Sequence, residues 1–184
     1  MPNQPRRGRG RNYHLTAPLG FTSSEIGTLV AALDELRERL FDVIADMPPG
    51  ALSFVPTDGR NSASMLVCHM AAAEAVWIAR ATGATIPDDL AADLAPGRRS
   101  DDDQLPPSSS SAGALVALCR RVRDEITVPA LSGIDDAGRP TPDAGPLGTL
   151  REVLMHLVWH WTYHTGQVGL LRRLAGPRYK WTYA

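Results

Sequence analysis

The sequence predicts an all-α protein, a four-helix bundle with long inter-helix loops, and three observations support this fold class. Apolar residues recur with a period near 3.6 in four segments, strand-like alternation is nearly absent, and one short and two long connections separate the segments. The chain has 184 residues, of which 43% are hydrophobic and 21% are charged. This length and composition suit a single domain that buries its own core.

The first two predicted helices have clear start and stop signals. The first follows Thr22, where a capping box reaches Glu25, and its apolar spacing continues until the segment Pro48-Pro49-Gly50. The second begins around residues 61–62 and ends at Gly83. It is rich in alanine and apolar on most sides, which predicts a well-buried helix.

The third helix is predicted after a long connection. Residues 86–111 are dense in Pro, Asp, Gly and Ser, and we interpret them as a loop whose charged residues form a solvated surface. The third helix then follows Ser108–Ser111 and ends before Pro129.

The fourth helix begins at Thr149, with Glu152 completing a second capping box, and continues through Leu174 to a Gly-Pro stop signal. We therefore expect the bundle to occupy residues 21–176. A flexible basic arm over residues 1–20 precedes it and a tail over residues 177–184 follows it.

Charge and cysteine content narrow the function classes. A net charge of −1 provides no overall field that would attract nucleic acid or a membrane surface, so we expect neither as a partner. No apolar run approaches the roughly 20 residues that a membrane span needs. Cys68 and Cys119 are too few for a disulfide framework, which indicates a cytoplasmic protein.

The fourth helix carries three of the five histidines, His156, His160 and His164, within about an 80° arc. Neighbouring pairs are about 6 Å apart and can bind one ion, whereas the outer two are about 12 Å apart and cannot share it. A third ligand is available from His69 on an inward face of the second helix. Two readings stay open at this point: a metal site, or core histidines that hydrogen-bond to carbonyls and hydroxyls.

Two stretches resemble signature helices of the DinB/YfiT superfamily. They are NSASMLVCHMAAAEAVWIARATG, in which one histidine is followed by Glu and Trp, and WHWTYHTGQVGLLRRLAG, which contains the pattern His-x-x-x-His-x-Gly-Gln followed by Leu-Arg and a Gly. The resemblance covers roughly residues 24–176. It implies a four-helix bundle with one divalent transition metal, zinc or nickel, held by His69, His160 and His164. His156 would then hydrogen-bond in the core or line the pocket.

The resemblance also implies a chemistry. Similar proteins include bacillithiol- or mycothiol-dependent S-transferases and a mycothiol-dependent maleylpyruvate isomerase. We therefore expect a metal-dependent enzyme that transfers a low-molecular-weight thiol of the mycothiol type to a small electrophilic substrate. The alternatives are a hydrolase of the same fold and a non-enzymatic metal-binding bundle. Many relatives are dimers, which makes a homodimer the expected assembly.

Further residues are candidates for roles around this site. Tyr163 is a candidate proton donor and Gln167, on the ligand face, a candidate support for a ligand. Arg80 shares the face of His69 and is a candidate for holding a substrate carboxylate. Glu74 is rotated about 140° from His69, which predicts a surface or capping role. Tyr163 and Thr165 depart from the residues common in relatives, which puts substrate specificity in doubt.

Overall fold

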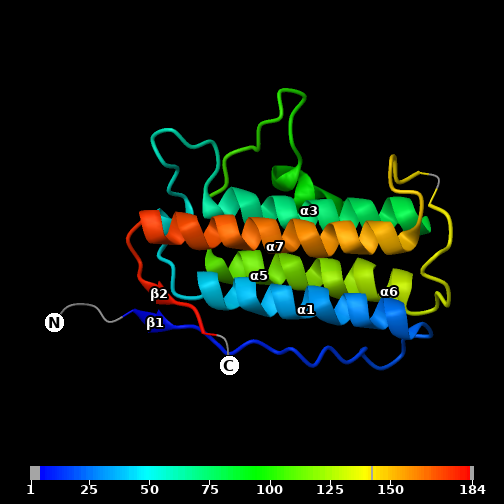
Figure 1. The fold of residues 1–184 in the computed structure, drawn as a ribbon. Helices are drawn as coiled ribbons and strands as arrows, with labels where there is room; N and C mark the ends of the chain where they lie inside the picture. The colour runs from blue at the N-terminus through cyan, green and yellow to red at the C-terminus, as the bar shows by residue number, and fades with distance from the viewer. Residues whose placement is uncertain (1–4, 142, 183–184) are drawn as a thin grey trace.

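The computed structural model describes residues 5–141 and 143–182, and it confirms the predicted all-α class. Four long helical segments lie side by side as a bundle (Figure 1). They are α1 (Ser24–Ile44), α3 (Ala63–Thr82), the run that starts with α5 (Ala112–Arg121), and α7 (Leu150–Leu174). α7 packs against both α1 and α3, so two of its flanks contribute to the core.

The helix ends follow the capping signals with one correction. The α1 cap is Ser23, whose side chain accepts from the backbone of Ile26, so the prediction of a capping box reaching Glu25 was wrong. Glu25 instead forms an ion pair with Arg151 of α7. α3 begins at the cap Ser62 and ends at Gly83 in the left-handed conformation, as predicted. A further helical turn, α2 (Pro49–Leu52), follows α1.

The start of α7 also agrees with the sequence. Thr149 caps α7 and forms the predicted capping box with Glu152.

The connection after α3 is not wholly a loop. It contains α4 (Asp88–Leu94) and the short 3-10 turn η1 (Ala95–Gly97), so the prediction of a loop over residues 86–111 was wrong there. Leu90 and Leu94 are one helical turn apart and fully buried, which explains why this acidic segment folds as a helix against α3. The connection thereby packs along α3.

The third helical segment continues past its predicted end. α5 is followed by a π-helical turn, η2 (Val122–Thr127), and then by α6 (Val128–Leu131), which contains Pro129. Proline is tolerated because it lies in the first turn of α6, directly after the wider π-helical turn, which interrupts the α-helical hydrogen-bond pattern. The prediction that the helix ends before Pro129 was therefore wrong.

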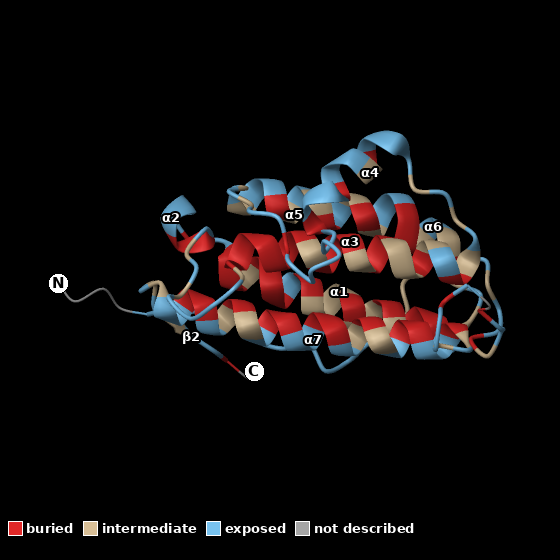
Figure 2. Ribbon diagram, turned by 90° about the horizontal axis from the view of Figure 1, so that it is seen from above, coloured by how far each residue is buried: buried red, intermediate tan, exposed pale blue. Residues whose placement is uncertain are grey.

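The core lies where the inner faces of the long helices meet, as the buried residues in Figure 2 show. It consists mainly of aliphatic side chains from α1, α3 and α7, together with the aromatic residues Phe41 and Trp161. Burial of this apolar surface is the main stabilising contribution to the fold. Among the described residues, no helix combines the length and the apolar character needed to cross a membrane.

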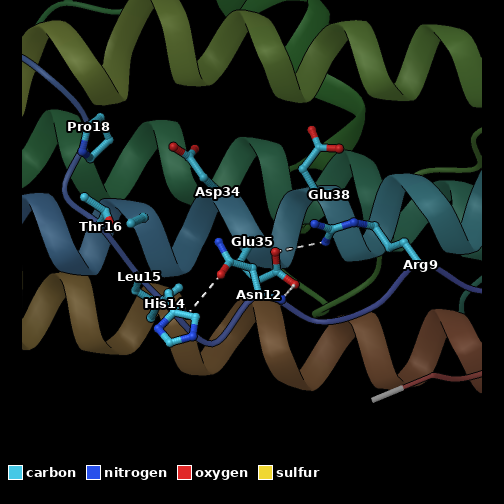
Figure 3. A pocket seen from close by; sticks show the side chains of 10 residues that line it. Arg9, Asn12, His14, Leu15, Thr16, Pro18, Asp34, Glu35 and Glu38 are labelled. Carbon is cyan, nitrogen blue, oxygen red and sulfur yellow. Dashed lines mark hydrogen bonds and ion pairs between the residues drawn. The ribbon is translucent and has the colours of Figure 1, made fainter. Parts of the chain in front are cut away.

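The described part of the N-terminal segment follows α1 in extended form, and its first residues pair with the end of the chain. β1 (Arg6–Arg7) forms a two-stranded parallel sheet with β2 (Tyr179–Lys180). Arg9 donates to Glu35 at 2.9 Å, and the same carboxylate accepts from the backbone of Asn12 (Figure 3). The boundaries at residues 20 and 176 and the flexibility of the arm stay predictions.

Candidate metal centre

Three of the histidines converge where α3 packs against α7. His69 comes from the middle of α3, and His160 and His164 come from successive turns of α7. One ring nitrogen of each lies within 4.8 Å of the other two, a grouping that can hold a metal ion. His160 and His164 are buried, with exposed fractions of 9% and 6%. The i, i+4 spacing on a rigid helix fixes two positions, and the packing of α3 on α7 supplies the third.

Two of the rings are oriented by hydrogen bonds at the nitrogen that faces away from the centre. His69 Nδ1 is 3.0 Å from the carbonyl oxygen of Gly97, and His164 Nδ1 is 2.6 Å from Oε1 of Gln167. Because a carbonyl oxygen only accepts hydrogen bonds, the contact with Gly97 places the proton of His69 on Nδ1. The contact with Oε1 of the Gln167 amide places the proton of His164 on Nδ1 in the same way. The Nε2 lone pairs of both rings are then available for a metal.

The spacing of one pair of ring nitrogens matches that of two ligands of a divalent transition metal. His160 Nε2 lies 3.2 Å from His69 Nε2. Zn–N distances of about 2.0–2.1 Å in a tetrahedral site place two ligand nitrogens about 3.3–3.4 Å apart. His160 Nδ1 is buried and has no hydrogen-bond partner, whereas His160 Nε2 faces His69. Nε2 is therefore the nitrogen of His160 that can bind a metal. Three imidazoles from two helices leave a further coordination position that the described residues do not fill.

The environment keeps these imidazoles neutral. Burial, with the neighbouring histidines adding a smaller effect, lowers the pKa of His160 to about 3. Burial also lowers the pKa of His164 to about 4, although the hydrogen bond to Gln167 opposes that shift. Burial is likewise the main cause that lowers the pKa of His69. Neutral imidazole is the form that binds metal, so the site is ready for a cation at neutral pH.

Sequence reasoning missed the contribution of Gly97. The turn η1 passes so close to α3 that a Cβ on Gly97 would collide with the backbone of Cys68, so only glycine fits there. This close approach brings the Gly97 carbonyl to His69. A glycine beside Arg98 and Arg99 in an apparent loop carried no signal of such a role.

The other predicted site residues lie at different distances from the three histidines. Gln167 is in direct contact with His164, and Tyr163 places its ring 5.1 Å from the His164 ring while remaining half exposed. His156 is half-buried and lies 5.9 Å from His160 by ring centroids, outside the group of three but beside it. Arg80 is exposed in the last turn of α3, about 16 Å along the axis from His69. No described contact brings Arg80 to the histidines.

Three neighbours complete the surroundings of the site. The ring of Trp77 lies 5.1 Å from that of His156 and covers this end of the site. The charge of Arg99, which pairs with Asp103, contributes to the lowered pKa of His69 after the larger effect of burial. Cys68 is buried against the Ser108 hydroxyl at 3.5 Å, and burial raises the pKa of its thiol, which makes it an unreactive neighbour.

Glu74 does not have the predicted surface or capping role. It is completely buried and forms an ion pair with Arg37 of α1, with a further hydrogen bond from Thr127 in the π-helical turn. A carboxylate can be buried this deeply only with such partners. The prediction failed because the cation that pairs with Glu74 comes from another helix and has no sequence pattern linking it to α3.

A four-helix bundle with three converging histidines from two of its helices is the architecture of the DinB/YfiT-like superfamily. A family model described as mycothiol-S-transferase matches residues 28–176, and the chain belongs to this family. A search of curated proteins gave no match.

Proposed function

We propose that this protein is a metal-dependent S-transferase in which His69, His160 and His164 hold one divalent transition metal. The observation that carries this proposal is the orientation of His69 and His164, whose Nδ1 atoms are hydrogen-bonded outward so that Nε2 faces the centre. Core histidines do not need this common direction. Three imidazole nitrogens suit zinc or nickel equally well.

When bound, a metal with three neutral ligands and an open position lowers the pKa of a thiol that coordinates to it. The proposed cosubstrate is a low-molecular-weight thiol of the mycothiol type, which agrees with the family of the chain. The sulfur forms a new bond to an electrophilic carbon of a small molecule, and the leaving group departs or a double bond is saturated. No protein cysteine is needed, since Cys68 and Cys119 are both buried.

The residues around the histidines have separate roles in this proposal. Gln167 and Gly97 hold the ligand rings in position, because each accepts the proton on the far side of one imidazole. Tyr163 is half exposed beside His164, where its phenol can donate a proton to the product. His156 and Trp77 form an aromatic wall that limits how a substrate enters.

The test is elemental analysis of the purified protein, followed by an activity assay. We expect about one transition-metal ion per chain in the wild type and a loss of most of it in His160→Ala. The matched control is His14→Ala, since His14 is exposed on the N-terminal segment. The metal-loaded protein should then conjugate mycothiol to an activated aryl halide, with glutathione and cysteine as comparison thiols.

Two outcomes would contradict the proposal. A wild type that takes up neither zinc nor nickel would show that the three histidines have a purely structural role. A metal-loaded protein that hydrolyses amide or ester substrates but conjugates no thiol would replace the transferase with a hydrolase of the same site.

The proposal also places the protein in the cytoplasm. A thiol cosubstrate must be kept reduced, and both cysteines of the chain are free and buried. A fusion to a fluorescent protein, imaged in cells, would check this location.

A further inference from the structure

Segments from the two ends of the chain meet at one end of the bundle and bring cationic side chains together. β1 pairs with β2 in parallel, and in this register Arg7 lies directly opposite Lys180 (Figure 1). Arg173 in the last turn of α7 and Arg178 just before β2 belong to the same region. All four side chains are exposed, and we call them the cationic cluster.

A cavity of about 480 Å³ lies where the end of α7 meets the tail that follows it. Its volume is within the range of about 300–1,000 Å³ that is usual for small-molecule sites. Four cationic side chains line it: Arg172, Arg173, Arg178 and Lys180. No carboxylate side chain of the described residues is part of this lining, although the net charge of the whole chain is −1.

The cationic cluster is not neutralised by the described part of the protein. Arg172 donates to both carboxylate oxygens of Asp46, at 2.6 and 3.0 Å, and Asp42 is engaged by Arg6 and by the hydroxyl of Tyr179. Among residues 5–141 and 143–182, no ion pair includes a member of the cluster. Like charges on adjacent strands repel each other. The cluster is therefore a local excess of positive charge that the stability of the fold does not require.

Backbone contacts hold the cluster in place without using its side chains. The backbone N–H of Arg6 donates to the carbonyl of Arg178 at 3.2 Å, and that of Gly8 donates to the carbonyl of Lys180 at 2.9 Å. A Cβ on Gly8 would collide with the phenol of Tyr179, so the close approach of the two segments requires glycine there. The backbone positions of the cations are thus fixed before a ligand binds, which lowers the entropic cost of binding.

The cluster lies largely outside the part of the chain that matches the family. The family model covers residues 28–176, whereas Arg7, Arg178 and Lys180 come before or after this range. Arg173 follows His164 by nine residues on the same helix, which is about 14 Å along the axis. The cluster is therefore an addition to the bundle and a site separate from the metal centre.

We propose that the cationic cluster binds a small molecule that carries at least two phosphate groups. Guanidinium and ammonium groups form strong charge-assisted hydrogen bonds to phosphate oxygens. Two phosphate groups carry about three to four negative charges at pH 7, which matches the four cations of the cluster. Trp181 also lines the cavity and is 39% exposed, so it provides an aromatic surface for the organic part of the ligand.

The shape of the site favours a small molecule over a polymer. Proteins that bind single-stranded nucleic acid place their cations along a groove that follows the backbone, whereas here the cations line one cavity. The ligand joins the two ends of the chain, because it neutralises Arg7 on β1 and Lys180 on β2 together. It therefore raises the melting temperature of the protein.

The first experiment is calorimetric titration with inorganic pyrophosphate at low salt. We expect one pyrophosphate to bind per chain, and Arg178→Ala and Lys180→Ala each to weaken binding about 10-fold. The matched control is Arg139→Ala, which removes an exposed arginine from the connection between α6 and α7 at the other end of the bundle and should leave the affinity unchanged (Figure 1). A wild type that does not bind pyrophosphate, or an affinity that survives both cluster substitutions together, would overturn the proposal.

Thermal unfolding of the same variants gives a second readout. Pyrophosphate should raise the melting temperature of the wild type but not that of the double variant Arg178→Ala/Lys180→Ala. Without pyrophosphate, Lys180→Ala should be at least as stable as the wild type, since the repulsion from Arg7 is removed. A loss of stability in Lys180→Ala without the anion would show that this lysine serves the fold, and it would contradict the proposal.

The third experiment separates this site from the metal centre, because pyrophosphate can also coordinate a metal ion. His160→Ala should bind pyrophosphate as well as the wild type does, so a failure of the transferase proposal leaves this test unaffected. Loss of binding in His160→Ala, with no effect of the cluster substitutions, would place the anion at the metal centre and overturn the proposal. Binding of a short DNA duplex or of phosphatidylglycerol vesicles by a protein that ignores pyrophosphate would also overturn it.

Discussion

Replacing Gln167 with leucine should weaken metal binding at a site whose three ligands are all retained. In the metal-free protein, His164 can shift its proton from Nδ1 to Nε2 and does not depend on an acceptor. With a metal at Nε2 the proton must be on Nδ1, where Gln167 accepts it at 2.6 Å in a setting that is 6% exposed. Without that acceptor a buried N–H is unsatisfied in the metal-bound state only, at a cost of about 1–3 kcal/mol.

This free energy corresponds to a loss of affinity of about 5- to 150-fold, which includes the 10- to 100-fold range that is usual for partners that orient a metal ligand. The assay is competition for Zn²⁺ between the protein and a chromogenic chelator at pH 7. Gln167→Glu is the matched control, because its carboxylate keeps an acceptor near the same place and should retain or strengthen binding. Equal affinities for the leucine variant and the wild type would refute the reasoning and, with it, the assignment of Nε2 as the ligand atom of His164.

The remaining predictions concern the loop, the buried ion pair and acid stability. Gly97→Ala should lower the free energy of unfolding by about 1–3 kcal/mol and lower the metal content, since η1 can no longer approach α3. The control is Gly113→Ala, which places its Cβ in open space and should not destabilise the protein. Thermal unfolding and elemental analysis of both variants check this. Glu74→Gln should destabilise by about 1–3 kcal/mol in urea unfolding, because the buried guanidinium of Arg37 then keeps only Asp34 as its counter-charge, and an unchanged free energy of unfolding would contradict this. The hydrogen bond and charge of Arg172 hold the pKa of Asp46 below its usual value, so the stability that Asp46 contributes is present above about pH 4 and lost as the pH falls further. Asp46→Asn should therefore flatten the decline of the melting temperature of metal-free protein between about pH 5 and 3.

The bundle could be predicted from the sequence because its helices are marked by local signals. The apolar periodicity and the caps at Ser62 and Thr149 involve residues within one or two turns of one another, and such patterns can be read without knowing the fold. The same holds for the pair His160 and His164. Their spacing alone places two imidazoles on one side of a helix.

The elements that were missed depend on contacts between segments distant in the chain. α4 folds because Leu90 and Leu94 are buried against α3, although the composition of α4 is that of a loop. Glu74 is buried because Arg37 of another helix neutralises it. Gly97 contributes a backbone carbonyl, which every residue type has, and its lack of a Cβ matters only for a contact with α3 that the sequence does not reveal. Tertiary packing decided each of these three cases, and periodicity contains no information about it.

The number of ligands and the residues that orient them favour a reactive metal site over a purely structural one. A structural metal site closes its coordination with protein ligands, whereas the described residues here supply three nitrogens and then partners that orient them. One oriented ring depends on the same helix through Gln167, and another depends on the connection between α3 and α5 through Gly97. Because that connection also carries Arg99, a substrate that binds to it would act on the position of His69 directly. Substrate affinity and metal affinity should therefore be linked in this protein, which equilibrium binding of Zn²⁺ with and without a bound thiol would measure.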